Sequence, residues 1–180
     1  MRLGIVMNLK RQKWNDPYIQ RYTTISNWFK QKQIRMRTLV LFYRYTPLLV
    51  VVSYFYLLIE CLITKGSAGL IRVILVPFFA FVLVTLMRKL FNQPRPYAKY
   101  EVEPLIYRKK SGESFPSRHT LSVSIIAMAW LWVNPVIGII LWLLAFIIAA
   151  TRVLSGVHFL KDVVAAICIS AFIGWIGFFC

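Results

Sequence analysis

The sequence is poor in acidic residues, histidines and cysteines. It holds 6 Asp and Glu against 22 Lys and Arg, a formal net charge of +16, and only 2 histidines in 180 residues. The cysteines, Cys61, Cys168 and Cys180, stand in or beside apolar runs, and their spacing fits neither a metal site nor a disulfide framework. We therefore interpret them as small core residues and expect no metal or other cofactor.

No cleavable signal peptide is expected, because residues 1–36 lack a sustained apolar segment. Apolar residues are otherwise abundant: they make up 59% of the chain, and the mean hydropathy is +0.65, too high for an ordinary soluble domain. Most basic residues flank the apolar runs. This distribution predicts a multi-pass protein of the cell membrane whose partners are anionic lipids and phosphorylated substrates, not nucleic acid.

Five apolar runs predict an all-α, polytopic membrane helix bundle of one domain over residues 38–180. The runs cover about residues 45–63, 70–90, 117–133, 136–151 and 159–179. A turn at 65–69 joins the first two, and Asn134-Pro135 joins the third and fourth. Gly174 and Gly177 in the last run are expected to allow close helix contact.

Residues 1–37 form a basic segment with nine Lys and Arg and a single acid. Tyr18, Tyr22, Ile25 and Phe29 recur at three- and four-residue spacing, which predicts an amphipathic helix lying on the membrane surface. A solvated basic tail is the alternative. Residues 91–117, by contrast, contain four prolines and cannot lie in lipid, so they predict a surface loop of functional importance.

One short stretch, residues 151–162, gathers an Arg, a His and an Asp between two apolar runs. His158 and Asp162 are four residues apart, so on a helix the carboxylate can hold one imidazole nitrogen and make the other a better nucleophile. The alternative is a plain helix boundary, with a histidine at a membrane helix end and an aspartate that caps the helix or faces water. On this stretch alone, both interpretations remain open.

An odd number of spans places three helix ends on one side of the bilayer, near residues 88–95, 117–119 and 152–158. The polar side chains that gather there are Arg88, Lys89, Arg95, Ser117, Arg118, His119, Arg152, His158, Lys161 and Asp162. Several guanidinium groups in one pocket repel each other unless an anion binds between them, and phosphate suits their bidentate donors. The backbone N–H groups of a helix start add to such a site. Positive-inside topology is the competing explanation; it accounts for Lys99 and residues 108–110, but not for both histidines.

Three segments resemble the ordered signatures of the type 2 phosphatidic acid phosphatase superfamily. They are Arg88-Lys89-Leu90-Phe91-Asn92-Gln93-Pro94-Arg95-Pro96, Pro116-Ser117-Arg118-His119, and Thr151-Arg152 with Gly156-Val157-His158-Phe159-Leu160-Lys161-Asp162. The resemblance covers about residues 70–170. Three positions depart from the common pattern: the family usually has Lys at Arg88, Gly at Arg118 and Ser at Thr151. None of these changes removes a reacting group.

The resemblance implies a metal-independent lipid phosphatase with an active-site loop over residues 88–118. His158 is the expected nucleophile, Asp162 orients it, and His119 protonates the leaving oxygen and then activates water. The phosphate oxygens are expected to be held by Arg88, Arg95, Ser117, Arg118 and Arg152. The substrate is expected to be phosphatidic acid, phosphatidylglycerophosphate or an isoprenyl diphosphate, a choice that the sequence leaves open.

The side of the membrane follows from the basic segment 1–37. If this segment is cytoplasmic, five spans put the active face in the cytoplasm too. Many family members are expected to have six spans and an outward-facing site, so that arrangement is the alternative. The alternative functions are those of a non-catalytic lipid- or anion-binding membrane protein and of a small anion transporter. The charges collect at one face and leave the spans nearly empty, which argues against transport.

Overall fold

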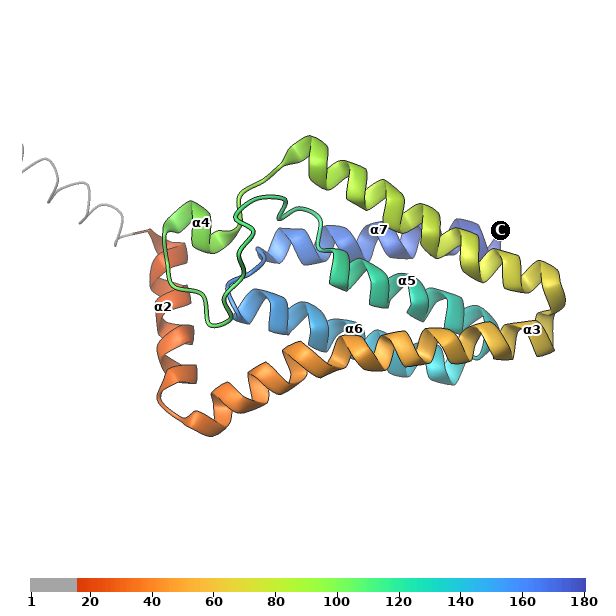
Figure 1. The fold of residues 1–180 in the computed structure, drawn as a ribbon, viewed down its shortest axis with the longest axis horizontal. Coiled ribbons are helices and arrows are strands. Elements are labelled where there is room, and N and C mark those ends of the chain that lie inside the picture. The colour runs from red at the N-terminus through yellow and green to blue at the C-terminus, as the bar shows by residue number, and fades with distance from the viewer. Residues whose placement is uncertain (1–15) are drawn as a thin grey trace, which may run out of the picture.

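The computed structural model describes residues 16–180, whose regular structure is entirely helical, as predicted. The helices are α2 Pro17–Lys30, α3 Gln33–Phe91, α4 Pro96–Tyr100, α5 Arg118–Val133, α6 Pro135–Leu154 and α7 Leu160–Phe179. Figure 1 shows α3, α5, α6 and α7 running along the long axis of the molecule, while α2 crosses one end of them. The long loop between α3 and α5, residues 92–117, lies at that same end and contains only the short α4.

Helix α3 contains the first two predicted spans and folds back on itself between them. Gly66, within the predicted turn, has φ 69° and ψ −166°, a left-handed backbone that favours glycine. We call residues 33–65 the first arm of α3 and residues 67–91 its second arm. The two arms open from Gly66 toward the end that carries α4 (Figure 1).

Three helical stretches are long and apolar enough to cross a membrane: Gln33–Tyr100, Pro135–Leu154 and Leu160–Phe179. The first holds both arms of α3, and the remaining predicted span lies in α5, which has 16 residues. The structure thus has a helix at each predicted span, whereas the number of membrane crossings stays a prediction. Large apolar side chains are exposed along the outside of the bundle, as contact with lipid requires; they include Leu48, Val52, Phe55, Ile59, Phe79, Leu143, Phe172 and Trp175.

Helix α5 is the central helix, packed by α3, α6 and α7. Its Trp130 is fully buried, and the indole Nε1–H donates to Ser53 Oγ at 2.9 Å. Close helix contact at Gly174 is confirmed, because a Cβ there would lie 2.6 Å from Met128 Cβ. A Cβ at Gly177 would meet Val76 of the second arm equally closely. This packing fixes the start of α5 in the middle of one end of the bundle.

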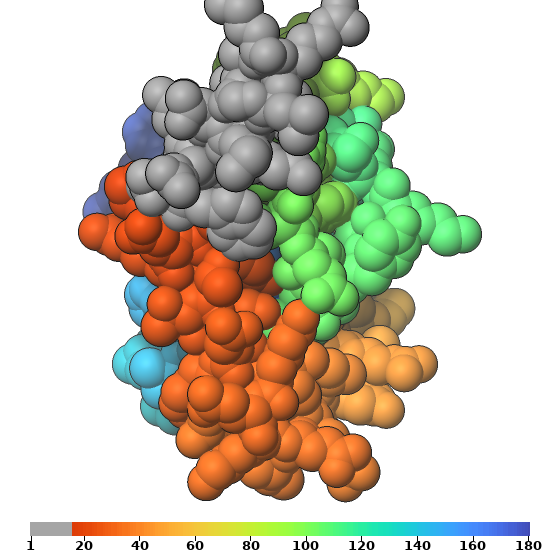
Figure 2. All heavy atoms as spheres, turned by 90° about the vertical axis from the view of Figure 1, so that its left-hand side faces the viewer, coloured from red at the N-terminus to blue at the C-terminus, as the bar shows by residue number. Residues whose placement is uncertain are grey.

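The helix predicted in the basic N-terminal segment is confirmed for residues 17–30, while residues 1–15 lie outside the described part of the chain. The Asp16 carboxylate caps α2 by accepting from the Tyr18 N–H at 2.8 Å. The buried face consists of Ile19, Tyr22 and Ser26, so the predicted membrane-facing side was wrong at Tyr22, whereas Ile25 is 37% exposed. Figure 2 shows α2 lying beside the 92–117 loop on the end face, which explains the difference, because this side of α2 contacts protein. Its position on a membrane surface stays a prediction.

Candidate active site

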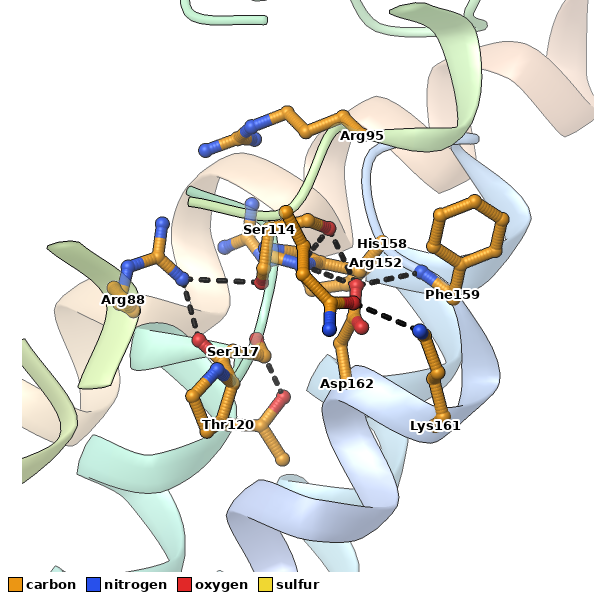
Figure 3. A network of polar contacts seen from close by, with 12 residues as sticks. Arg88, Arg95, Ser114, Ser117, Thr120, Arg152, His158, Phe159, Lys161 and Asp162 are labelled. Atoms are coloured by element: carbon orange, nitrogen blue, oxygen red, sulfur yellow. Dashed lines mark hydrogen bonds and ion pairs between the residues drawn. The ribbon is translucent and has the colours of Figure 1, made fainter. Parts of the chain in front are cut away.

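Four helix ends meet below the 92–117 loop and carry the polar residues of the three sequence motifs (Figure 3). Arg88 is in the last turn of α3, Ser117 immediately precedes α5, and Arg152 is in the last turn of α6. His158 lies in the turn between α6 and α7, and Asp162 is in the first turn of α7. Residues far apart in the chain therefore lie together at one end of the bundle, as the same-side argument predicted.

His158 is held from behind by a carboxylate and a hydroxyl. Its Nδ1 lies 3.4 Å from Asp162 Oδ2 and 3.4 Å from Ser114 Oγ. The Ser114 hydroxyl in turn donates to Asp162 Oδ2 at 2.5 Å, and His158 and Asp162 are 2% and 0% exposed. The carboxylate fixes the ring through Nδ1 and leaves Nε2 for chemistry. Ser114 lies outside the three motifs, and sequence reasoning missed it.

The carboxylate of Asp162 is itself fixed by the start of α7. Oδ2 accepts from the Phe159 backbone N–H at 2.9 Å, so the side chain satisfies a free donor of the helix N-terminus. A negative charge in the first turn is also favoured by the helix dipole. The plain helix-boundary interpretation and the catalytic one therefore coincide here: Asp162 caps α7 and holds His158 at the same time.

The turn that carries His158 is braced from α2. Gly156 has φ +75°, and a Cβ at this position would lie 2.5 Å from the Tyr22 hydroxyl. That hydroxyl lies 3.4 Å from the Ser155 carbonyl and 3.3 Å from the Glu103 carbonyl, and it accepts from the Leu105 N–H at 3.1 Å. Tyr22 thus ties α2 and the 92–117 loop to the turn before His158. The spacing of Tyr22 in the sequence predicts a membrane-facing side chain, and nothing in that spacing indicates this contact.

The environment of His158 favours its neutral form. Burial is the main reason that the pKa of His158 lies below its usual value; the hydrogen bond with Asp162 opposes this shift, and the nearby Arg95 adds to it. Burial also lowers the pKa of Arg95, whose Nε–H donates to the Gly112 carbonyl at 3.2 Å. A neutral imidazole has the free electron pair that a nucleophile needs.

Two buried arginines keep donors without partners. Arg88 donates through Nη1 to the Ser114 carbonyl at 3.2 Å and to the Pro116 carbonyl, and Arg152 donates through Nη2 to the Tyr43 carbonyl at 3.3 Å. Within residues 16–180, Arg88 Nε and Arg152 Nε and Nη1 have no hydrogen-bond partner. Buried guanidinium donors without partners are costly, and an anion with several oxygens satisfies them.

A cavity of about 510 Å³ lies in front of these groups. Six of the eight predicted site residues line it: Arg88, Arg95, Arg118, His119, Arg152 and His158. The other two lie behind the wall. Asp162 sits behind His158, and Ser117 is fully buried, with its Oγ accepting from Thr120 Oγ1 at 3.1 Å and its N–H donating to the Asp162 carbonyl at 3.0 Å. The Ser117 N–H, one of the donors at the start of α5 that we expected to face the phosphate, therefore already donates to a backbone carbonyl.

The remaining lining residues were not predicted as part of the site: Tyr43, Tyr107, Arg108, Lys109, Lys110 and Val157. Among the lining residues of the described chain there are seven Arg and Lys and two His besides, but no acidic side chain. Positive-inside topology had accounted for residues 108–110 in the sequence, and only the folded loop brings them to the cavity. Such a cavity suits a multiply charged anion.

An apolar groove of about 510 Å³ opens from the same place. It runs between the two arms of α3 and along α5, and it shares Arg118 and His119 with the cationic cavity. The rest of its lining is mostly apolar: Pro47, Val50, Val51, Tyr54, Phe55, Phe81, Ser122, Val123, Ile126 and Ile148. A polar headgroup site that continues into an apolar groove fits an amphiphilic ligand.

Comparison with known proteins agrees with this arrangement. A sequence profile of the PAP2 superfamily matches residues 69–180. The chain is 31% identical over 96 residues to undecaprenyl-diphosphatase BcrC of Bacillus subtilis (strain 168), a match that covers 53% of this chain. It covers 48% of BcrC, so the match spans about half the length of that relative.

Two solved structures are similar to the whole fold. The crystal structure of Aquifex aeolicus LpxE has a TM-score of 0.69 and 29% identity, and the match covers 88% of this chain and 93% of that one. A transmembrane PAP2-type phosphatidylglycerolphosphate phosphatase from Bacillus subtilis has a TM-score of 0.63 over 98% and 92% of the two chains, with 18% identity, a likeness of fold alone. Because the family profile covers most of the chain and includes all three motifs, the chain belongs to the PAP2 superfamily.

Proposed function

We propose that this protein removes the terminal phosphate from a membrane lipid through a covalent phosphohistidine at His158. One observation carries the proposal: the His158 ring, held by Asp162 and Ser114, lines a cavity whose charged lining is cationic. A neutral imidazole with an orienting carboxylate is an effective nucleophile. The surrounding cations stabilise the charge that develops on the phosphoryl oxygens.

The reaction proceeds in two steps. His158 Nε2 attacks phosphorus, the N–P bond forms, the P–O bond to the lipid breaks, and His119 gives its proton to the leaving oxygen. His119, now neutral, then takes a proton from water; the water oxygen attacks phosphorus, and the N–P bond breaks to release phosphate and His158. Arg88, Arg95 and Arg152 hold the equatorial oxygens, Arg118 stands at the mouth of the cavity, and Ser117 supports the start of α5 behind it. These side chains supply the positive charge, so we expect no metal requirement.

The substrate class follows from the groove beside the cavity. A lipid whose phosphate reaches the arginines can lay its chain between the arms of α3, in the groove that shares Arg118 and His119 with the site. Phosphatidic acid, phosphatidylglycerophosphate and isoprenyl diphosphates all have this shape. The similarity to an undecaprenyl-diphosphatase supports the last class.

Phosphate release from a lipid panel tests the proposal. The purified protein in detergent, with chelator present, is offered the three lipids, and we expect phosphate release from at least one of them. Quenching in alkaline detergent during turnover should trap phosphate on His158, because the N–P bond is labile in acid but stable in base; mass spectrometry of the His158 peptide, kept at alkaline pH, identifies it. Binding of a lipid phosphate without release would favour the alternative, a non-catalytic lipid- or anion-binding membrane protein. A need for added metal would contradict the chemistry above.

We further propose that five spans cross the membrane and that the cavity faces the cytoplasm, with the division into a basic segment 1–37 and a membrane domain 38–180. Ser67, beside the Gly66 bend, and Ser111, in the 92–117 loop, are both exposed, and the bend and the loop lie at opposite ends of the helix bundle. Each is replaced by Cys in a chain whose exposed Cys168 and Cys180 are changed to Ser. An impermeant maleimide applied to intact cells should label Ser67→Cys and not Ser111→Cys. The reverse result would place the cavity outside.

A further inference from the structure

The chain segment at residues 108–110 is fixed over the cavity and does not hang free as a basic loop. The Tyr97 hydroxyl of α4 donates to the backbone carbonyls of this segment: it lies 3.2 Å from the Arg108 oxygen and contacts the Lys110 oxygen as well. The Arg108 side chain is fixed separately, because its Nε–H donates to the Tyr43 hydroxyl at 2.9 Å. Both ends of Arg108 are thereby held in place.

Tyr43 places two guanidinium groups side by side. Its ring lies 3.7 Å from the Arg152 guanidinium carbon and 5.3 Å from that of Arg108, and its own backbone carbonyl accepts from Arg152. Tyr43 is buried in the first arm of α3, and both it and Arg108 line the cavity that contains His158. The family profile begins at residue 69, so this contribution comes from a part of the chain that the profile does not cover.

The charge near Arg108 exceeds what one phosphoryl group requires. Arg88, Arg95 and Arg152 already offer planar donors for the oxygens of a single phosphoryl group next to His158. Arg108 adds a further guanidinium, and within residues 16–180 no carboxylate forms an ion pair with it. A cation that only sets the membrane topology does not need to be held in one position. Arg108 is held twice, by the Tyr43 hydroxyl at its side chain and by the Tyr97 hydroxyl at its backbone carbonyl. A fixed cation in a cavity without acidic lining is arranged for an anion.

We propose that Arg108, positioned by Tyr43, binds a second phosphoryl group of the substrate and gives the enzyme a preference for lipid diphosphates over lipid monophosphates. The inference rests on the proposed function. The terminal phosphoryl group passes to His158, the P–O bond to the inner phosphoryl group breaks, and Arg108 holds the lipid monophosphate that leaves. Arg108 is then a substrate-binding residue, and Tyr43 is a positioning residue.

The test compares two substrates with the same chain, geranylgeranyl diphosphate and geranylgeranyl monophosphate, in detergent with chelator. The wild type should prefer the diphosphate in kcat/KM. Arg108→Gln should lower kcat/KM by about tenfold or more for the diphosphate, mainly through KM, and by less than about threefold for the monophosphate, because one charge-assisted contact is lost. Arg108→Lys should recover part of the loss.

Tyr43→Phe and Lys89→Gln complete the design. Tyr43→Phe removes the hydroxyl that holds Arg108 and leaves the ring under Arg152, so the same selective loss should appear at smaller size. Lys89→Gln removes one charge from the neighbouring helix end; this exposed side chain lines no cavity of the site, and both substrates should be unaffected. Equal losses on the two substrates in Arg108→Gln, no loss at all, or a wild type that prefers the monophosphate would overturn the inference while the proposed function stands. A wild type that releases phosphate from no lipid would overturn both.

Discussion

The two histidines of the candidate site line the same cavity and are held very differently. His158 is 2% exposed and is braced by Asp162, by Ser114 and, through the preceding turn, by Tyr22. His119 is an exposed residue in the first turn of α5, where the cationic cavity meets the apolar groove. The contrast fits two roles: a nucleophile must be aimed, whereas an acid and base that serves first a leaving group and then water needs access to both.

The largest loss of activity is expected when His158 is replaced. His158→Ala removes the atom that attacks phosphorus, so phosphate release should fall by at least about 10³-fold on every lipid. No phosphohistidine should form in the alkaline-quench measurement, in which the wild type accumulates it. Thermal unfolding in detergent should show that the variant is folded, and Lys89→Gln serves as the active control. Release close to that of the wild type would refute the nucleophile assignment.

The effect of replacing His119 should depend on the leaving group of the substrate. His119→Ala should lower release from a phosphomonoester by about 10²- to 10⁴-fold, because an alkoxide leaves poorly without a proton. A diphosphate expels a phosphate whose last proton has a pKa of about 6, so its first step depends less on the acid. With that substrate the phosphohistidine should accumulate, since His119 is also needed to activate water. Equal losses on both substrates without accumulation would contradict the role.

A smaller but still large loss of activity is expected when the Asp162 carboxylate, which holds His158, loses its charge. Asp162→Asn keeps an acceptor for the Phe159 N–H but no longer stabilises a positive charge on His158, and we expect a drop in kcat of about 10²-fold with little change in KM. The variant should retain the helix cap and near-native thermal stability. A rise in KM with unchanged kcat would show that Asp162 acts in substrate binding instead.

The smallest effect belongs to the hydroxyl that sequence reasoning missed. Ser114→Ala removes a donor to Asp162 Oδ2 and leaves the backbone carbonyl that accepts from Arg88, so we expect a loss of about tenfold in kcat. Ser114→Thr, which keeps the hydroxyl, should lose less. Steady-state kinetics of the two variants on one lipid measure this difference. Equal losses in kcat would show that the hydroxyl at position 114 does not contribute.

Much of the fold could be predicted because its signals are local. Long apolar runs, the glycine turn near Gly66 and the Asn134-Pro135 break are readable from neighbouring residues; the structure has a helix at each run, a bend at Gly66 and a break at Asn134. The buried face of α2 could not be read in this way. A tyrosine at helical spacing suits lipid or protein equally well, and only the loop packed against α2 turns Tyr22 inward.

The same division holds for the candidate site. His158 and Asp162 are one helical turn apart, and motif order brought Arg88, Arg95, Arg118, His119 and Arg152 to the same face. Their placement around one cavity agrees with that prediction, while their roles remain proposals. Ser117 is different: its motif suggested a phosphate ligand, but the structure buries it behind the wall, against Thr120.

The sequence by itself determined the class of this protein, its helices and the chemical groups that meet at one membrane face. Those properties depend on hydropathy runs and on motifs a few residues long. Only the tertiary structure decided which other residues join them: Ser114 behind His158, Tyr22 under its turn, and Tyr43 beside Arg108. The physical reason is separation along the chain, because these contacts join residues 44 to 133 positions apart, and no local pattern records which distant loop will fold over a helix end.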